Sequence, residues 1–207
     1  MTLTRRQTLA AAAVLAGAAA ATAGLPRVAL AQAAVAEMSM GDPNAPVTLV
    51  EYAMFTCPHC AAFAEDVFPK IKANYIDTGK VRLVFREVYF NKPALWAAMV
   101  ARCAPADRYF GIADALFATQ ASWAAEQDPQ AMLGKLYGIG RQAGLTDAEM
   151  NACMQDRAMA EALVGEYQKH AEADGIDSTP TFLIDGRKES NMSWEDFEAK
   201  LNEALGA

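Results

Sequence analysis

Residues 47–60 read VTLVEYAMFTCPHC, an apolar, β-rich run that ends in two cysteines three positions apart. Residues 47–54 have the composition of a buried strand, and turn-forming residues precede them at 41–46 (GDPNAP). From residue 58 apolar side chains recur at four-residue spacing, the pattern of a helix that Pro69 is expected to kink. The stretch predicts a buried strand that leads directly into a helix with a cysteine pair at its start.

The remaining segments complete an alternation of strands and helices. Residues 80–89 alternate apolar and polar side chains and predict a second strand, whereas residues 93–174 contain only helical segments separated by breaks. Within them, residues 146–149 (TDAE) have the pattern of a helix capping box. The chain then has a strand at 181–184, a turn at 185–186 with a short final strand, and a helix over 194–205 capped by Ser193. This order resembles an α/β thioredoxin fold with an inserted helical domain over about 93–174.

The first 33 residues have the pattern of an export signal. Arg5 and Arg6 precede an alanine-rich apolar run at 9–23, and small residues follow, with expected cleavage near Ala31 or Ala33. Residues 4–9 (TRRQTL) resemble a twin-arginine signal, although Thr8 stands where a larger apolar residue is more usual, so the general secretory route stays open. We expect a mature domain over residues 34–207.

The charge balance argues against a nucleic-acid partner. The whole chain has a formal net charge of −7, and residues 1–33 carry three arginines and no acid. The mature domain therefore has 15 basic and 25 acidic residues, a net charge of −10. Phosphate backbones would be repelled by such a domain.

The cysteine pair has the pattern of a redox centre. A helix N-terminus offers unpaired N–H groups and partial positive charge, which favour the thiolate of Cys57 and make it the expected nucleophile. Pro58 suits the first helical turn, and the imidazole of His59 is expected to lower the Cys57 pKa further. Cys60, one turn into the helix, is the expected resolving cysteine. Because a low thiol pKa favours the reduced form, the pair is predicted to donate its disulfide.

Two further interpretations concern Glu51 and metal binding. Glu51 is the single charge in an apolar strand, so its pKa should rise, and it is a candidate proton acceptor for Cys60; a salt bridge at an exposed strand end is the alternative. A zinc site would need two more ligands beside the cysteine pair, and the chain has only His59 and His170. We therefore expect neither a metal nor a cofactor.

Three motifs resemble the DsbA family of periplasmic disulfide oxidases: the CPHC motif at 57–60, residues 46–52 (PVTLVEY), and residues 179–182 (TPTF). The resemblance covers residues 40–207. It implies that Pro180 is a cis-proline facing the cysteines and that the Thr179 backbone pairs with an extended client segment. It also implies a periplasmic enzyme that oxidises reduced exported proteins and that a membrane quinone-linked oxidase reoxidises. We expect the protein to be a monomer.

Other assignments stay open on the residues alone. Thr179 before Pro180 also occurs in isomerases and reductases of the same fold, although the segment before Val47 is short for the dimerisation domain that isomerases usually have. A non-catalytic binding domain with an inert disulfide is a further alternative. Cys103 and Cys153 lie in separate helical segments, and export to an oxidising compartment favours a structural disulfide between them, which some relatives carry, over two buried thiols.

Overall fold

The structure is a computed structural model that describes residues 35–206. The predicted export signal over residues 1–33, with its arginine pair and its cleavage near Ala31 or Ala33, lies outside the described residues. No helix within 35–206 is both long and apolar enough to span a membrane.

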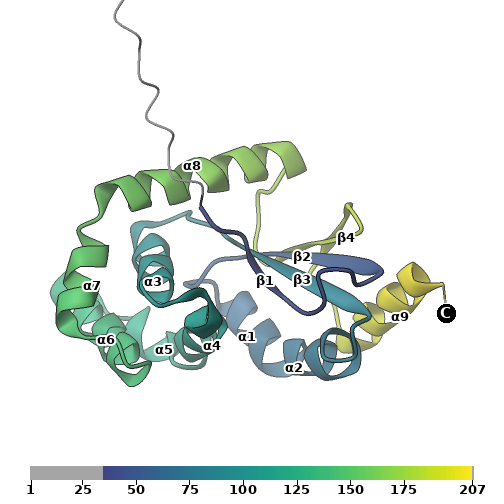
Figure 1. The fold of residues 1–207 in the computed structure, drawn as a ribbon, viewed down its shortest axis with the longest axis horizontal. Coiled ribbons are helices and arrows are strands. Elements are labelled where there is room, and N and C mark those ends of the chain that lie inside the picture. The colour runs from purple at the N-terminus through teal and green to yellow at the C-terminus, as the bar shows by residue number, and fades with distance from the viewer. Residues whose placement is uncertain (1–34, 207) are drawn as a thin grey trace, which may run out of the picture. The chain divides into compact units, whose positions relative to one another are not determined.

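A mixed sheet of five strands forms the centre of the described region (Figure 1). Its central strand β2 runs parallel to β3 and antiparallel to β4, while β1 and β5 form the two edges. In spatial order the strands are β1 (Met38–Met40), β3 (Val81–Glu87), β2 (Val47–Ala53), β4 (Thr181–Ile184) and β5 (Arg187–Ser190). The strands predicted after residues 46, 79 and 180 are confirmed.

Strand β1 was not predicted, because its three residues (MSM) contain no β-branched or aromatic side chain. It forms through pairing with β3, where Met38 lies opposite Phe85 and Met40 opposite Leu83. Its place at the sheet edge is therefore decided by tertiary contacts and not by local propensity.

Helices cover both faces of the sheet. On one face, Phe63 of α1 (Pro58–Asp66) and Phe197 of α9 (Trp194–Leu205) pack on β2 and β4 around Leu49 and Phe182. On the other face, α8 (Arg157–Asp174) lies across the sheet (Figure 1). Because side chains of a strand alternate between faces, Glu51 points to the same face as Leu49, toward α1.

The long helix predicted from residue 58 is interrupted, as the proline at 69 implies. Helix α1 ends at Asp66, α2 spans Phe68–Ile71, and a π-helical turn, η1, spans Lys72–Ile76. Proline has no N–H for the backbone ladder, so the helix cannot continue unbroken through this position.

The inserted helical domain is confirmed, and its first helix begins at Lys92. Its elements are α3 (Lys92–Arg102), the 3₁₀ turn η2 (Ala106–Arg108), α4 (Tyr109–Ala118), α5 (Gln120–Trp123), α6 (Pro129–Gln142), α7 (Asp147–Met154) and α8. A buried ion pair attaches the insertion to the sheet, with Arg102 Nε 2.6 Å from the Glu87 carboxylate at the end of β3. The Tyr109 hydroxyl donates to the same carboxylate at 2.7 Å.

Candidate active site

The two cysteines lie where β2 gives way to α1. Cys57 is the N-cap of α1 with an extended backbone (φ −85°, ψ 119°), and Pro58 fills the first helical position, where its missing N–H is not needed. Both sulfurs are free thiols, with Cys57 7% exposed and Cys60 fully buried. An incoming sulfur can therefore reach Cys57 and not Cys60.

The Cys57 sulfur is held by several hydrogen bonds. In its protonated form the Cys57 thiol donates to the Thr179 carbonyl oxygen, at 3.3 Å. A hydrogen bond from the Cys60 thiol lowers the pKa of Cys57 to about 5; burial opposes this shift, while the Thr179 side chain and the backbone N–H groups of Cys60 and His59 add to it. At neutral pH the group is a thiolate, the reactive form of cysteine.

His59 acts on Cys57 through its backbone, and the role predicted for its imidazole stays a prediction. The sequence assigned the stabilisation of the thiolate to its imidazole, but in the described part of the chain no hydrogen bond joins that ring to Cys57. Positions two residues apart on a helix do not face each other, and the His59 side chain is exposed. Its backbone N–H, which any residue except proline would supply, lowers the Cys57 pKa instead.

A loop distant in the sequence completes the front of the site. The peptide bond between Thr179 and Pro180 is cis, and Pro180 is buried directly before β4. The contact between the Cys57 sulfur and the Thr179 carbonyl joins residues 122 positions apart. The structure thus brings together the motifs at 57–60 and 179–182 on which the family resemblance rests.

The pKa of Cys60 is shifted in the opposite direction from that of Cys57. The hydrogen bond to Cys57 raises the pKa of Cys60 well above its usual range; burial and the charge of Glu51 add to this. The pair therefore carries one proton between two sulfurs over a wide range of pH, with the proton on Cys60.

Glu51 lies behind Cys60 in the interior. It is 3% exposed, and none of the hydrogen bonds or ion pairs found in residues 35–206 involves its carboxyl. Burial raises the pKa of Glu51 to about 8, and the charge of Asp114 adds to the rise. The raised pKa agrees with the burial argument from sequence, whereas the alternative of a salt bridge at an exposed strand end does not describe this residue.

Two amides that the sequence analysis did not single out shape the loop before α1. Buried Gln120 of α5 donates from Nε2 to the carbonyls of Phe55 (2.7 Å) and Cys57 (2.9 Å). Asn91, the N-cap of α3, donates to the Thr56 hydroxyl at 2.9 Å. A lone glutamine in an apolar helical segment was the available signal, but it does not reveal which carbonyls the amide binds.

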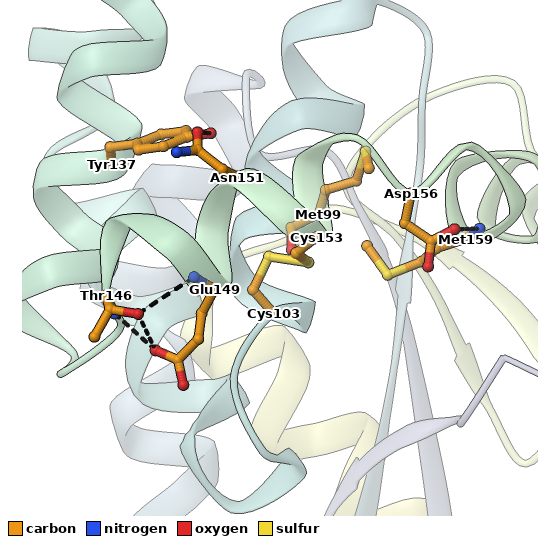
Figure 2. The surroundings of a disulfide bond; sticks show 9 residues. All are labelled: Met99, Cys103, Tyr137, Thr146, Glu149, Asn151, Cys153, Asp156 and Met159. Carbon is orange, nitrogen blue, oxygen red and sulfur yellow. Dashed lines mark hydrogen bonds between the residues drawn. A yellow bond between two sulfur atoms is a disulfide. The ribbon is translucent and has the colours of Figure 1, made fainter.

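Cys103 and Cys153 form a disulfide within the insertion (Figure 2). It joins the C-cap of α3 to α7, with Cα atoms 5.7 Å apart. Figure 2 also shows the predicted capping box at the start of α7, in which Thr146 and Glu149 exchange hydrogen bonds. This disulfide fixes the insertion and does not reach the cysteines of the motif.

A dithiol at a helix start, opposite a cis-proline on a mixed sheet, is the arrangement of thioredoxin-fold redox proteins, and the family model described as thioredoxin matches residues 33–203. The crystal structure of Wolbachia pipientis alpha-DsbA1 matches with a TM-score of 0.76 and 31% identity, over 82% of this chain and 91% of that one. The chain therefore belongs to the thioredoxin family and, within it, to the DsbA-like proteins.

Curated relatives agree with this assignment. A Rickettsia bellii protein, whose name places it provisionally among the protein-disulfide oxidoreductases, is 29% identical over 170 residues, which are 82% of this chain and 64% of the relative. Disulfide bond formation protein D of Bacillus subtilis is 27% identical over 161 residues, which are 74% of this chain and 70% of the relative. The chain thus spans less than two thirds of the length of the Rickettsia protein.

Proposed function

We propose that this chain is a periplasmic thiol-disulfide oxidoreductase that donates a disulfide between Cys57 and Cys60 to exported proteins. The observation that carries the proposal is the divergence of the two thiols, with the pKa of Cys57 lowered to about 5 and that of Cys60 raised. A stable thiolate is a good leaving group, so the reduced form is favoured and the disulfide is a strong oxidant.

The reaction proceeds through a mixed disulfide. A client thiolate attacks Cys57 Sγ, the Cys57–Cys60 bond breaks, and the Cys60 sulfur leaves and takes up a proton. A second client thiolate then attacks the client sulfur of the mixed disulfide, and Cys57 departs as a thiolate. The client loses two electrons and gains a disulfide, and the protein is left as the dithiol.

The residues around the sulfurs have matching roles. Glu51, protonated below its raised pKa, supplies the proton that Cys60 takes up. The backbone of Thr179, which lies beside the Cys57 sulfur, pairs with an extended client segment next to buried Pro180. Backbone pairing accepts many client sequences, which suits an enzyme that acts on reduced, unfolded proteins.

Export and reoxidation complete the proposal. The pattern of residues 1–33 supports export through a twin-arginine or general secretory signal, with cleavage near Ala31 or Ala33. The reduced protein returns to the disulfide form through a membrane quinone-linked oxidase, and the enzyme works as a monomer. N-terminal sequencing of protein from a periplasmic extract tests export and signal cleavage, and size-exclusion chromatography tests the monomeric state.

A glutathione redox titration of the purified mature protein tests the direction of the reaction. A disulfide oxidase should have a potential more oxidising than about −200 mV, whereas a value near that of cytosolic thioredoxins, about −270 mV, would overturn the proposal in favour of a reductase. Threonine before the cis-proline, which also occurs in isomerases and reductases, is the feature that favours this second candidate. Refolding of a scrambled client in a redox buffer separates isomerase from oxidase activity.

Alkylation of the same purified protein distinguishes an enzyme from a non-catalytic binding domain. Iodoacetamide should alkylate Cys57 of the reduced protein with an apparent pKa well below that of free cysteine. If the protein is a non-catalytic domain, the Cys57 thiol should have a pKa equal to or above that of free cysteine.

A further inference from the structure

The carboxyl of Glu51 faces a small cavity between the sheet and the inserted helices. The cavity has a volume of about 20 Å³, and apart from Glu51 and Asp114 its walls are apolar, with phenylalanines from α1, α2, β3 and α4. A space of roughly 10–15 Å³ admits one water molecule. Glu51 can therefore exchange a proton toward this cavity, while the remaining walls offer no group that ionises.

Asp114 lies at the outer end of the same cavity. It belongs to α4, it is exposed to solvent, and it lines both the cavity and a larger open groove of about 450 Å³ between α1, α2 and α4. Ala64, Phe68 and Phe117 also line both spaces, so the cavity and the groove share a wall. Asp114 is the one carboxyl among the described residues that lines both spaces.

We propose that Asp114 is the proton-transfer residue through which buried Glu51 exchanges its proton with solvent during the redox cycle. This inference rests on the proposed function, because it assigns a route to a proton that disulfide exchange must move. Asp114 touches neither sulfur and acts through Glu51. The route crosses the boundary between the thioredoxin core and the inserted helices.

The charges around the route are few. Cys60 of α1 and Asp114 of α4 are the ionisable groups that interact with Glu51, and the opposite residues on β3 and β4, Phe85 and Phe182, are apolar. Partial burial raises the pKa of Asp114, and the positive charge of Lys72 on η1 acts in the opposite direction. A carboxyl with a raised pKa accepts a proton more readily than an ordinary one, so the shift at Asp114 favours its role as the next proton acceptor after Glu51.

The route matters most when the dithiol is reoxidised. After Cys57 has formed a mixed disulfide, Cys60 must attack Cys57 Sγ and lose its proton. With a pKa of about 8, Glu51 is mostly protonated at pH 7 and must first release its own proton. In this step the Cys60 thiol attacks the Cys57 sulfur of the mixed disulfide, the Glu51 carboxylate takes up the Cys60 proton, and the bond between Cys57 and the partner sulfur breaks. The products are the Cys57–Cys60 disulfide, the protonated Glu51 carboxyl and the departing partner thiolate; the proton then moves to Asp114 and to solvent.

Reaction of the reduced protein with 5,5′-dithiobis(2-nitrobenzoate) isolates this step. The first thionitrobenzoate is released when Cys57 attacks the reagent, and the second when Cys60 resolves the mixed disulfide. Asp114→Asn should leave the first phase unchanged and slow the second about tenfold at pH 7 in dilute buffer, a modest effect for a lost proton-transfer group. Added formate, small enough for the groove, should restore the second phase.

The matched control is Glu65→Gln, because Glu65 lines the groove but not the cavity, and its removal changes the charge equally. Both phases should remain unchanged in this variant. The conservative Asp114→Glu variant should retain the second phase without formate.

A purely electrostatic role predicts the opposite result. Removing the Asp114 charge would lower the Glu51 pKa, increase its carboxylate fraction at pH 7 and accelerate the second phase. An accelerated or unchanged second phase, or a slow one that formate does not restore, would overturn the proposal. Failure of the proposed function appears separately, in the redox titration of the wild-type protein, because both phases occur whichever direction the enzyme takes in the cell.

Discussion

Replacing Cys57 with serine should remove a pH-dependent part of the stability of the reduced protein. The native environment lowers the Cys57 pKa from 9.0 to about 5. The thiolate thus contributes stability that is complete above the unfolded pKa and is lost as the pH falls through the folded one. From these two values its contribution is about 2.7 kcal/mol at pH 7 and about 0.4 kcal/mol at pH 5.

The assay is denaturant unfolding of wild type and Cys57→Ser in strong reductant at several pH values between 4 and 8. The free energy of unfolding of wild type minus that of the variant should rise by about 2 kcal/mol from pH 5 to pH 7. Other titrating groups, including Glu51, are present in both proteins and cancel in the difference. Oxidised wild type, which has no free thiol in the motif, should lack this rise.

Parallel stability curves for the two reduced proteins would refute the reasoning. They would mean that the folded protein does not favour the thiolate, and that hydrogen bonds from Cys60, Thr179 and the helix start do not act as the structure indicates. Alkylation of wild type across the same pH range gives the pKa independently and must agree with the unfolding data.

Three further predictions concern other parts of the molecule. Because the Glu51 pKa is raised to about 8, its neutral form contributes stability that is present below the unfolded pKa and lost as the pH rises through 8. Relative to Glu51→Gln, the reduced wild type should lose about 3.5 kcal/mol of unfolding free energy between pH 5 and pH 8, and equal curves would contradict this. Gln120→Ala removes the hydrogen bonds to two backbone carbonyls and should lower the free energy of unfolding in urea by about 2 to 4 kcal/mol. The exposed control Gln142→Ala should lower it by about 0.5 kcal/mol or less, and similar losses in the two variants would argue against a structural role of the Gln120 amide. Replacing both Cys103 and Cys153 with alanine opens a 50-residue loop and should lower the free energy of unfolding by about 4 kcal/mol in the same assay. The pKa of the Cys57 thiol should stay unchanged, and a shifted pKa would reveal coupling between this disulfide and the active site.

The sequence predicted those features that local chemistry determines. The apolar run at 47–54 can be satisfied only by a buried strand, and Pro58 and the cysteine spacing specify a helix start. The capping box at 146–149 follows from side-chain hydrogen bonding. The turn at 185–186 follows from backbone freedom, since Asp185 and Gly186 both have positive φ.

Features that depend on distant contacts could not be predicted. Strand β1 exists because β3 offers it an edge, and Gln120 matters because α5 turns its amide toward the loop before α1. The role predicted for the His59 imidazole stays a prediction, and the structure adds an effect of the His59 backbone N–H on the Cys57 pKa that the sequence did not reveal. Asp114 has no local pattern at all, since only the packing of α4 brings it to the cavity beside Glu51.

The hydrogen bonds that hold the Cys57 region come from positions 63 and 122 residues further along the chain. During synthesis the motif at 57–60 therefore leaves the ribosome well before Gln120 and Thr179 do. A nascent or excised segment that stops short of these partners would keep the hydrogen bond from Cys60 and the N–H groups of the helix start, but it would lack the Thr179 contact and the two hydrogen bonds from Gln120. The full acidity of this sulfur should therefore emerge only when the last strands of the sheet have docked, which would delay its full reactivity until the molecule is complete.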